Sequence, residues 1–324
     1  MSKKILLLII STIFLTFCTK EKLYVSEDQS EKIILNAQIY LSDTSHIVFS
    51  GISTVGTVMK LPDARIECYV NGKAVGNADF KLDTIGFSLQ SKYKFNAKFK
   101  PGDVVKISVS RKKEMAYSEV TVPYVGGAIS QVDTASDGDN MIFTAKVNDN
   151  SSGRNYYRLR LLHYYTAWLY NYLGVPLGEV SGSVSVPLGN DKDPILNGNK
   201  PGGDQEEYFT FTHPNKYCVF SDRLFNGNSC YVRVKASVDQ LYSLSINEYY
   251  HNVITRNYAV LSLVSITKEE YDYLNGLNTL EDTGYDSEDW LEQLTIENNV
   301  IGGLGFVSIS SENRLSIRLK DLSF

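Results

Sequence analysis

In the first third of the chain, apolar and polar residues alternate, which is the pattern of a β-strand with one buried face. The alternation runs through residues 33–39 and recurs at 66–70, 105–109 and 120–122, with no helical pattern between them. Turn-forming residues separate these segments: Asn71-Gly72, Gly76-Asn77 and Pro101-Gly102-Asp103. Several short strands at this spacing predict an Ig-like antiparallel β-sandwich over residues 31–123.

Residues 124–324 are also rich in strand-forming residues, although their pattern is less regular. The clearest predicted strands are Met141–Val147, Tyr156–Tyr172, Tyr208–Thr212, Ser229–Val238 and Tyr258–Ile266. Thr267 and Glu270 have the spacing of a helix-capping box, which predicts a helix over residues 268–278, and a second short helix is expected within 241–253. The predicted fold class is therefore mainly β, a sandwich followed by a larger β-rich C-terminal domain with one or two short helices.

The start of the chain has the pattern of a bacterial secretion signal. Lys3 and Lys4 precede a short apolar run, residues 5–17, and Cys18 follows directly. The run is too short to cross a membrane comfortably as a helix. Its last residues, Leu15-Thr16-Phe17-Cys18, resemble a lipobox, in which the signal is cut before the cysteine and the thiol is acylated. Several acyl chains make membrane anchoring stable.

We therefore expect residues 1–17 to be a signal peptide, Cys18 to carry lipid, and residues 18–30 to form a flexible tether. The expected partner at this end is a membrane, reached through the lipid anchor. Phe17 stands where a lipobox normally has a small residue, and the alternative is an ordinary signal peptide with an incidental cysteine. Thr19-Lys20-Glu21-Lys22 weakly resembles the signal that moves Bacteroidota lipoproteins to the outer face of the outer membrane. Because the resemblance is weak, both the cell-surface and the periplasmic face stay open for this protein.

Charge and motif content narrow the classes of function. The chain carries 32 Lys and Arg against 37 Asp and Glu, and its formal charge of −5 becomes −7 once Lys3 and Lys4 are removed. A mildly acidic chain without a basic cluster does not suit nucleic acid, so we expect no nucleic-acid partner. The sequence has no nucleophile elbow, zinc-protease motif or P-loop, and its four histidines are scattered, so we predict no cofactor and no metal site.

Three stretches have both a chemical and a structural interpretation. The run from Asp133 to Asn140 offers carboxylates to a cation but lacks the closing glutamate of a calcium loop, which favours an acidic turn. Asp191, Asp193 and the acids within 204–207 would form a glycosidase pair only if two carboxyls converged across a cleft, and solvated loop charges are the default. Gly302-Gly303-Leu304-Gly305 lacks the dinucleotide-binding spacing and predicts a bulge or a close approach of strands.

Three cysteines remain after Cys18. Cys68 alternates with apolar residues and is predicted to be a small buried hydrophobe. Cys218 and Cys230 flank a turn-like stretch, residues 222–227, and could meet across a hairpin. Both a Cys218–Cys230 disulfide and two free thiols therefore remain possible. Three cysteines cannot all pair with one another, and a chain of this length does not depend on disulfides for stability.

An aromatic row is the most suggestive surface pattern. If residues 161–172 form one strand, alternate side chains share a face and stand about 6.6 Å apart. The possible binding residues on that face are Tyr164, Trp168, Tyr170 and Tyr172. Tyrosine and tryptophan present an apolar body with a polar tip, which suits contacts with protein or sugar. With 22 tyrosines in the chain, core packing and cross-strand pairing remain the alternative.

Several stretches together resemble a family of Bacteroidota outer-membrane lipoproteins, domain of unknown function 4249. The matching stretches, in chain order, are Cys18, Asp63–Ile66, Thr121–Pro123, Asn155–Arg160, Ser221–Gly227 and Glu297–Phe306. The resemblance implies a lipid-anchored protein at the surface or periplasmic face of the outer membrane that accompanies a TonB-dependent β-barrel receptor. It brings no catalytic residues with it.

The leading hypothesis is a non-enzymatic outer-membrane lipoprotein, an accessory or ligand-capture partner of a TonB-dependent outer-membrane transporter. One alternative is a surface hydrolase acting on glycans or peptides, which requires acidic or nucleophilic residues converging in a cleft. Another is an adhesin or structural scaffold, in which the first sandwich spaces a binding face from the membrane. The identity of the ligand and the oligomeric state stay open.

Overall fold

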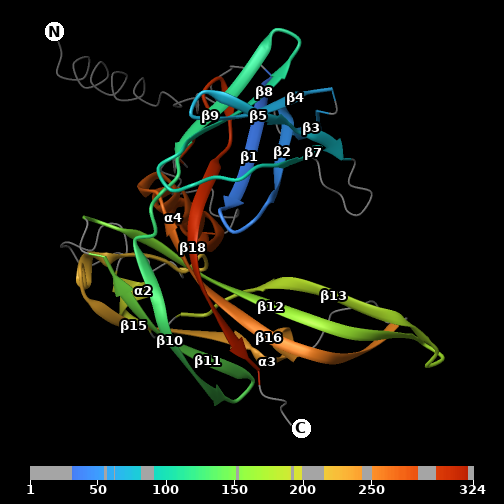
Figure 1. Ribbon diagram of the computed structural model, residues 1–324, viewed down its shortest axis with the longest axis vertical. Helices are drawn as coiled ribbons and strands as arrows, with labels where there is room; N and C mark the ends of the chain where they lie inside the picture. Colours follow the sequence, from blue (N-terminus) through green and yellow to red (C-terminus); the bar gives the residue numbers. More distant parts are fainter. Residues whose placement is uncertain are drawn as a thin grey trace, which may run out of the picture.

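A computed structural model of the chain describes residues 31–54, 57–61, 63–81, 91–150, 153–190, 193–198, 215–242, 250–283 and 297–319. Two β-sandwiches follow one another along the long axis of the molecule (Figure 1). The prediction of a mainly β fold is confirmed. The expected signal peptide, Cys18, the tether and the strand expected at 208–212 lie outside the described residues. Among the described helices, none has the length and apolar character needed to span a bilayer.

The first sandwich follows the alternation in the sequence, because its inward positions are the apolar ones. Ile107 and Val109 are fully buried and face Leu35 and Val48 in one core between two layers. Gly76-Asn77, predicted as a turn, instead ends a strand that pairs with its neighbour through an irregular register. One layer contains β1 (Lys32–Tyr40), β2 (Ser45–Thr54), β3 (Thr57–Lys60), β6 (Asp79–Lys81) and β7 (Ser91–Asn96). The facing layer contains β4 (Arg65–Val70), β5 (Lys73–Asn77), β8 (Val104–Arg111) and β9 (Glu114–Thr121).

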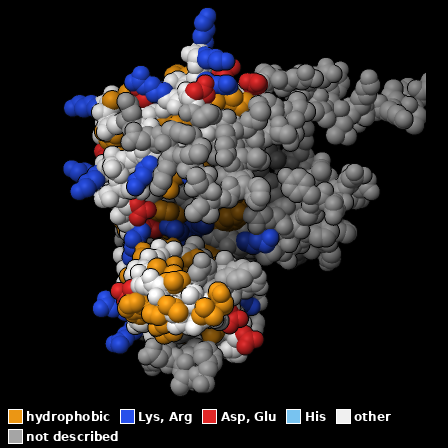
Figure 2. All heavy atoms as spheres, turned by 90° about the vertical axis from the view of Figure 1, so that its right-hand side faces the viewer, with side chains coloured by type: hydrophobic (Ala, Val, Ile, Leu, Met, Phe, Trp, Pro, Cys, Tyr) orange, Lys and Arg blue, Asp and Glu red, His pale blue; other side chains and the backbone are white. Residues whose placement is uncertain are grey.

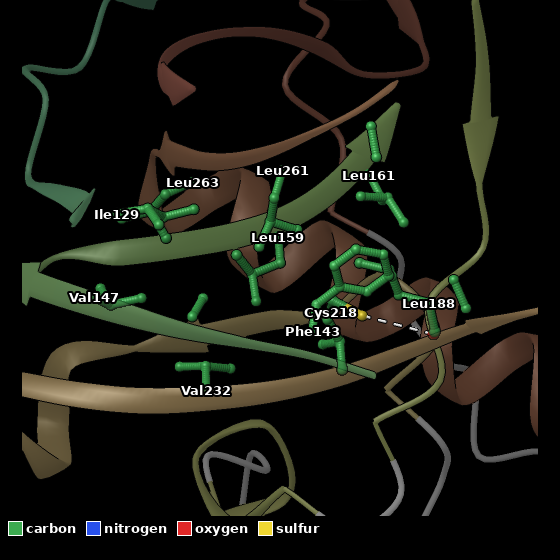
Figure 3. Close-up of a cluster of buried hydrophobic side chains, with 14 of the residues drawn as sticks. Ile129, Phe143, Val147, Leu159, Leu161, Leu188, Cys218, Val232, Leu261 and Leu263 are labelled. Carbon is green, nitrogen blue, oxygen red and sulfur yellow. Dashed lines mark hydrogen bonds between the residues drawn. The ribbon is translucent and has the colours of Figure 1, made fainter. Parts of the chain in front are cut away.

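The second sandwich has a separate core between two further layers. Figure 3 shows Leu159, Leu161 and Leu261 from one layer pointing toward Phe143 and Val232 from the other. The first layer contains β12 (Tyr156–Asn171), β13 (Pro176–Val186), β14 (Val219–Ser221) and β16 (Tyr250–Ile266). The facing layer contains β10 (Gly127–Asp137), β11 (Asn140–Asp149) and β15 (Ser229–Ser237). Short helical segments lie at its margins: α2 (Pro194–Gly198), η1 (Asp222–Leu224) and α3 (Val238–Tyr242).

Strand β18 (Val307–Arg318) belongs to both sandwiches. Its first residues, 307–310, pair in parallel with β1, and its remaining residues, 311–318, pair antiparallel with β16. Together with β17 (Gly303–Leu304), which also pairs in parallel with β1, it departs from the expected all-antiparallel arrangement. Val307 and Ile309 pack in the first core although they lie far beyond residue 123 in the sequence. The first sandwich is therefore completed by the C-terminal end of the chain.

Helix α4 (Lys268–Thr283) lies beside β18 at the junction of the sandwiches (Figure 1). It begins at the predicted residue, and the Thr267 side chain accepts a hydrogen bond from the Glu270 N–H at 3.2 Å, as a capping residue should. It continues past residue 278, where the prediction ended it. The helix expected within 241–253 is wrong from residue 250 onward, because 250–253 belong to β16; β-branched and aromatic side chains there prefer a sheet.

The glycine cluster near the C-terminus allows close packing between strands, as predicted. A Cβ atom on Gly303 would lie 2.4 Å from the Ile33 carbonyl oxygen and 2.8 Å from the Ala116 Cβ. On Gly305, which has a φ of +121°, a Cβ would lie 2.3 Å from the Leu35 carbonyl oxygen. Only glycine permits β17 to approach β1 and β9 this closely.

Gly303→Ala is expected to lower the free energy of unfolding by about 1–3 kcal/mol, because the added methyl group meets the Ile33 backbone and the Ala116 side chain. Gly276→Ala is the matched control, since a Cβ there meets nothing within 4 Å and α4 gains a better helix former, worth about 0.5–1 kcal/mol. Urea unfolding measures both. Equal midpoints for the two variants would contradict close packing at Gly303.

Candidate functional site

Strands β12, β13 and β16 extend beyond the second sandwich as a three-stranded arm (Figure 1). At its base, Leu161 and Leu261 are buried in the core, whereas farther out the strands have no facing layer among the described residues. The hairpin at the tip is held by Asn171, whose side-chain oxygen accepts hydrogen bonds from the N–H groups of Leu173 at 3.0 Å and Val175 at 2.9 Å. We call this segment the apolar arm.

The surface of the apolar arm is unusually apolar and poor in charge. Between residues 164 and 186, Glu179 is the only charged residue, and the part of β16 that pairs with this stretch adds the exposed Arg256. Figure 2 looks onto the end of the arm and shows hydrophobic side chains gathered over it. Leu173 is 69% exposed, Tyr172 66% and Trp168 40%. Other exposed apolar side chains of the arm are Val175, Leu177, Val180, Val184, Val253 and Tyr258. Contiguous exposed apolar surface of this kind is typical of a binding site.

The four aromatic residues singled out from the sequence all lie in this arm. Tyr164, Trp168 and Tyr170 occupy alternate positions of β12, and Tyr172 lies in the turn that follows the strand. The Tyr164 ring stacks on Tyr258 of β16, with centroids 5.1 Å apart and planes 3° apart. None of the four belongs to a buried core cluster. Burial in a core therefore does not account for the aromatic row, whereas cross-strand pairing accounts for Tyr164.

The outer edge of β13 pairs with no strand in the described part of the chain. Of the features that normally blunt an exposed edge, β13 has Pro176 at its start and an irregular register beside it, but it has no lysine, and Glu179 is its only charged residue. Gly182 is covered by Tyr165 across the strand pair, since a Cβ there would lie 2.6 Å from the Tyr165 hydroxyl oxygen. The arm thus stays paired along its length, with register shifts at 166/167 and 169/170, while one edge and both faces near its tip remain available.

A layer of buried charged groups lies between the two sandwiches. The Glu312 side chain of β18 is fully buried and accepts a hydrogen bond from Arg160 Nη1 at 3.0 Å and another from Arg314 Nε at 2.7 Å. The Arg160 guanidinium also lies 3.9 Å from the centre of the Tyr40 ring. These contacts join β1, β12 and β18, so they hold the two sandwiches in one arrangement.

Glu270 of α4 belongs to the same layer, and sequence reasoning missed its role. The capping box assigned its side chain to the start of the helix, but its carboxylate instead accepts a hydrogen bond from Ser310 Oγ at 2.8 Å. Burial raises the pKa of the Glu270 carboxyl, while Ser310 and the nearby charge of Arg158 act in the opposite direction. No local pattern signals this contact, because Ser310 lies in a different element forty positions away.

A cavity of about 250 Å³ opens beside Glu270. Its lining combines the charges of Arg158 and Glu270 with aromatic and aliphatic side chains of α4 and of the segment before β18. Tyr273 and Phe306 stack in its wall with centroids 4.2 Å apart. The cavity is therefore a second candidate site. It combines polar and apolar groups and is separate from the apolar arm.

Cys218 and Cys230 are free thiols in the structure, so the disulfide that their spacing allowed is not formed. Cys218 Sγ accepts a hydrogen bond from Asn190 Nδ2 at 3.1 Å and donates to the Leu188 carbonyl at 3.8 Å (Figure 3). Burial raises the pKa of Cys218 to about 11 and that of Cys230 to about 12. Both thiols are structural parts of the second core rather than reactive groups.

The acidic stretches have structural roles wherever they are described. Asp193 accepts hydrogen bonds from the backbone N–H groups of Leu196 at 2.9 Å and Arg233 at 2.6 Å. The run 133–140 spans the end of β10, a tight turn and the start of β11. Asp191 and the acids within 204–207 lie outside the described residues. Within the described ranges, no three His, Cys, Asp or Glu side chains are grouped to hold a metal ion.

Hydrogen bonds fix several of the stretches that carry the family resemblance. The Asn155 N–H donates to Asp222 Oδ2 at 2.7 Å, which connects two of them, and the Tyr157 hydroxyl donates to Asp149. Near the C-terminus, the Phe306 N–H donates to Asn36 Oδ1 at 2.9 Å. The family model for the domain of unknown function DUF4249 matches residues 20–316. The chain belongs to this family.

Likenesses to other known proteins are remote. No curated protein matches the sequence significantly. A DUF4785 family protein from Legionella pneumophila is 8% identical, with a TM-score of 0.22, and the match covers 71% of this chain and 52% of that one. A Bacteroides uniformis β-glucuronidase is 9% identical, with a TM-score of 0.17, over 85% of this chain and 26% of that one. The chain thus spans about half of the first protein and about a quarter of the second, and neither likeness carries an argument about function.

Glu270→Gln is expected to flatten the pH dependence of stability. Because burial raises the pKa of Glu270, the folded protein binds this proton more tightly than the unfolded chain. The free energy of unfolding of the wild type therefore falls as pH rises through the raised pKa, and glutamine removes that fall. Urea unfolding between about pH 5 and pH 8 measures it. Glu119→Gln, which changes an exposed carboxylate on β9, should keep the wild-type slope; an unchanged slope in Glu270→Gln would contradict the assignment.

Proposed function

We propose that this DUF4249 protein is a non-enzymatic, lipid-anchored protein of the outer membrane that docks through its apolar arm on a membrane-embedded β-barrel transporter. The observation that carries the proposal is the exposed apolar surface of β12, β13 and β16, where Glu179 and Arg256 are the charged residues beyond residue 164 of β12 and its partners. Exposed aromatic and aliphatic side chains of this kind supply binding free energy when a partner covers them. The TonB-dependent class of the partner comes from the family resemblance and is part of the proposal.

The shape of the arm supports a protein partner rather than a small molecule. Its apolar side chains lie on two open faces and a tip, with no described layer over them, so a partner can cover a large area at once. The unpaired edge of β13 adds a row of backbone donors and acceptors, which suits the addition of a strand from a β-rich partner. Sparse charge also avoids the desolvation cost of burying ions in such an interface.

The position of the arm supports the same proposal. The first described strand starts at the end of the molecule opposite the arm (Figure 1). A lipid on Cys18, joined through the residues that precede β1, would tether that end, and the arm would point away from the anchor. The arm is then clear of the lipid that holds Cys18 and available to a part of the second protein that projects from the same membrane.

Replacing apolar arm residues is expected to remove the transporter without unfolding the protein. In the triple variant Trp168→Ser, Leu173→Ser and Leu177→Ser, all three side chains are exposed, so stability should change by less than about 0.5 kcal/mol per site. Loss of interface anchors should lower co-purification of a large β-barrel from gently solubilised membranes at least about tenfold. Quantitative mass spectrometry measures the barrel and identifies its class.

The matched control changes equally exposed apolar residues away from the arm: Met115→Ser, Leu224→Ser and Tyr231→Ser. This variant should keep the barrel at the wild-type level. Equal recovery of the barrel with both triple variants, or recovery of no barrel with the wild type, would contradict docking through the arm.

Cys18→Ser is expected to move the protein from the membrane fraction to the soluble fraction, because it removes the site of acylation. Metabolic labelling with a fatty acid and fractionation of cells measure lipid and location separately. Retention in the membrane without label would mean that Cys18 is not the anchor. Protease treatment of whole cells then reports which side of the outer membrane the protein faces.

A further inference from the structure

The cavity beside Glu270 is lined by a half-buried cation with unused hydrogen-bonding capacity. This cation is Arg158, whose Nε atom is buried without a hydrogen-bond partner among the described residues. No carboxylate of the described residues forms an ion pair with this guanidinium, which lies 5.6 Å from the centre of the Tyr217 ring. Buried polar groups of native proteins normally have partners, so an unpaired donor at a cavity points to a ligand that could satisfy it.

Glu270 does not supply the missing partner, because its carboxylate has its own donors. Ser310 donates to it, and Ser308 and Gln38 also lie within hydrogen-bonding reach. The cavity therefore has one satisfied acid and one unsatisfied guanidinium on its polar side. A planar guanidinium is suited to bind a carboxylate through two parallel hydrogen bonds.

The rest of the cavity lining is mostly apolar. Leu274, Leu277 and the stacked rings of Tyr273 and Phe306 contribute to it, together with Phe49. The volume of about 250 Å³ holds a molecule of about one aromatic ring and a short chain, far less than a protein segment. We propose that this cavity binds a small monocarboxylate with an apolar body, its carboxylate on Arg158 and its body against Leu277 and the stacked rings of Tyr273 and Phe306.

The inference is independent of the apolar arm, because no residue of the cavity lining lies in the exposed part of the arm. The site lies where the two sandwiches and α4 meet, and Arg158 is in the part of β12 that leads into the arm. A ligand here would contact β1, β12, α4 and β18 together. Binding would therefore stabilise the junction as well as the site itself.

Calorimetric titration of the mature lipidated protein in detergent tests the inference with phenylacetate as the probe and phenylacetamide as its neutral analogue. The wild type should bind phenylacetate at millimolar concentration and the amide at least about tenfold more weakly, because only the carboxylate carries the charge that Arg158 pairs with. Equal binding of the two probes, or no binding of phenylacetate, would overturn the inference.

Arg158→Gln should weaken phenylacetate binding at least about tenfold and abolish the discrimination between the probes. Arg65→Gln, which removes the same charge from an exposed position on β4, should behave as the wild type. Leu277→Trp, which fills the cavity, should abolish binding of both probes, and it keeps the inference testable if Arg158→Gln does not fold. Unchanged phenylacetate binding in either Arg158→Gln or Leu277→Trp would show that the probe binds elsewhere.

Discussion

Strand β18 joins the two sandwiches through its backbone hydrogen bonds. Its first half completes the first sandwich beside β1, and its second half completes the second sandwich beside β16, so one continuous sheet passes through both. The glycines at 303 and 305 allow the chain to reach β1 at this point, and Glu312 of β18 accepts a hydrogen bond from Arg160 of β12 across the junction. The apolar arm and the cavity are both positioned by this arrangement, because β12 runs from the junction into the arm.

Much of the local structure follows from the sequence. Alternation identified β1, β4 and β8, since a half-buried strand needs an apolar residue at every second position. Thr267 marked the start of α4 because a hydroxyl is needed to accept a hydrogen bond from a free N–H group. The close approach at Gly303 was also predictable, because a glycine within a strand often marks a place where another backbone comes near.

The remaining features depend on partners distant in the chain, which a local pattern does not identify. Alternation places Trp168 on a face of β12, but it does not say whether a second layer covers that face. Glu270 has the spacing of a capping residue, but its carboxylate accepts a hydrogen bond from Ser310, which tertiary folding brings next to it. Gly76-Asn77 has the composition of a turn, but pairing with β4 keeps it in a strand. In each case tertiary contacts override the local preference.

The dependence of β1 on β18 has a consequence for how the chain folds as it is synthesised. Residues 37–40 pair with residues 307–310, so β1 has β2 on one side but lacks its second neighbour until almost the whole chain is available. Closing so long a loop is slow, and this edge of β1 stays unsatisfied until the loop closes. The first sandwich to emerge is therefore among the last parts to finish folding, and the chain needs protection from aggregation over that interval. A premature stop near the C-terminus would damage the N-terminal sandwich as severely as the C-terminal one.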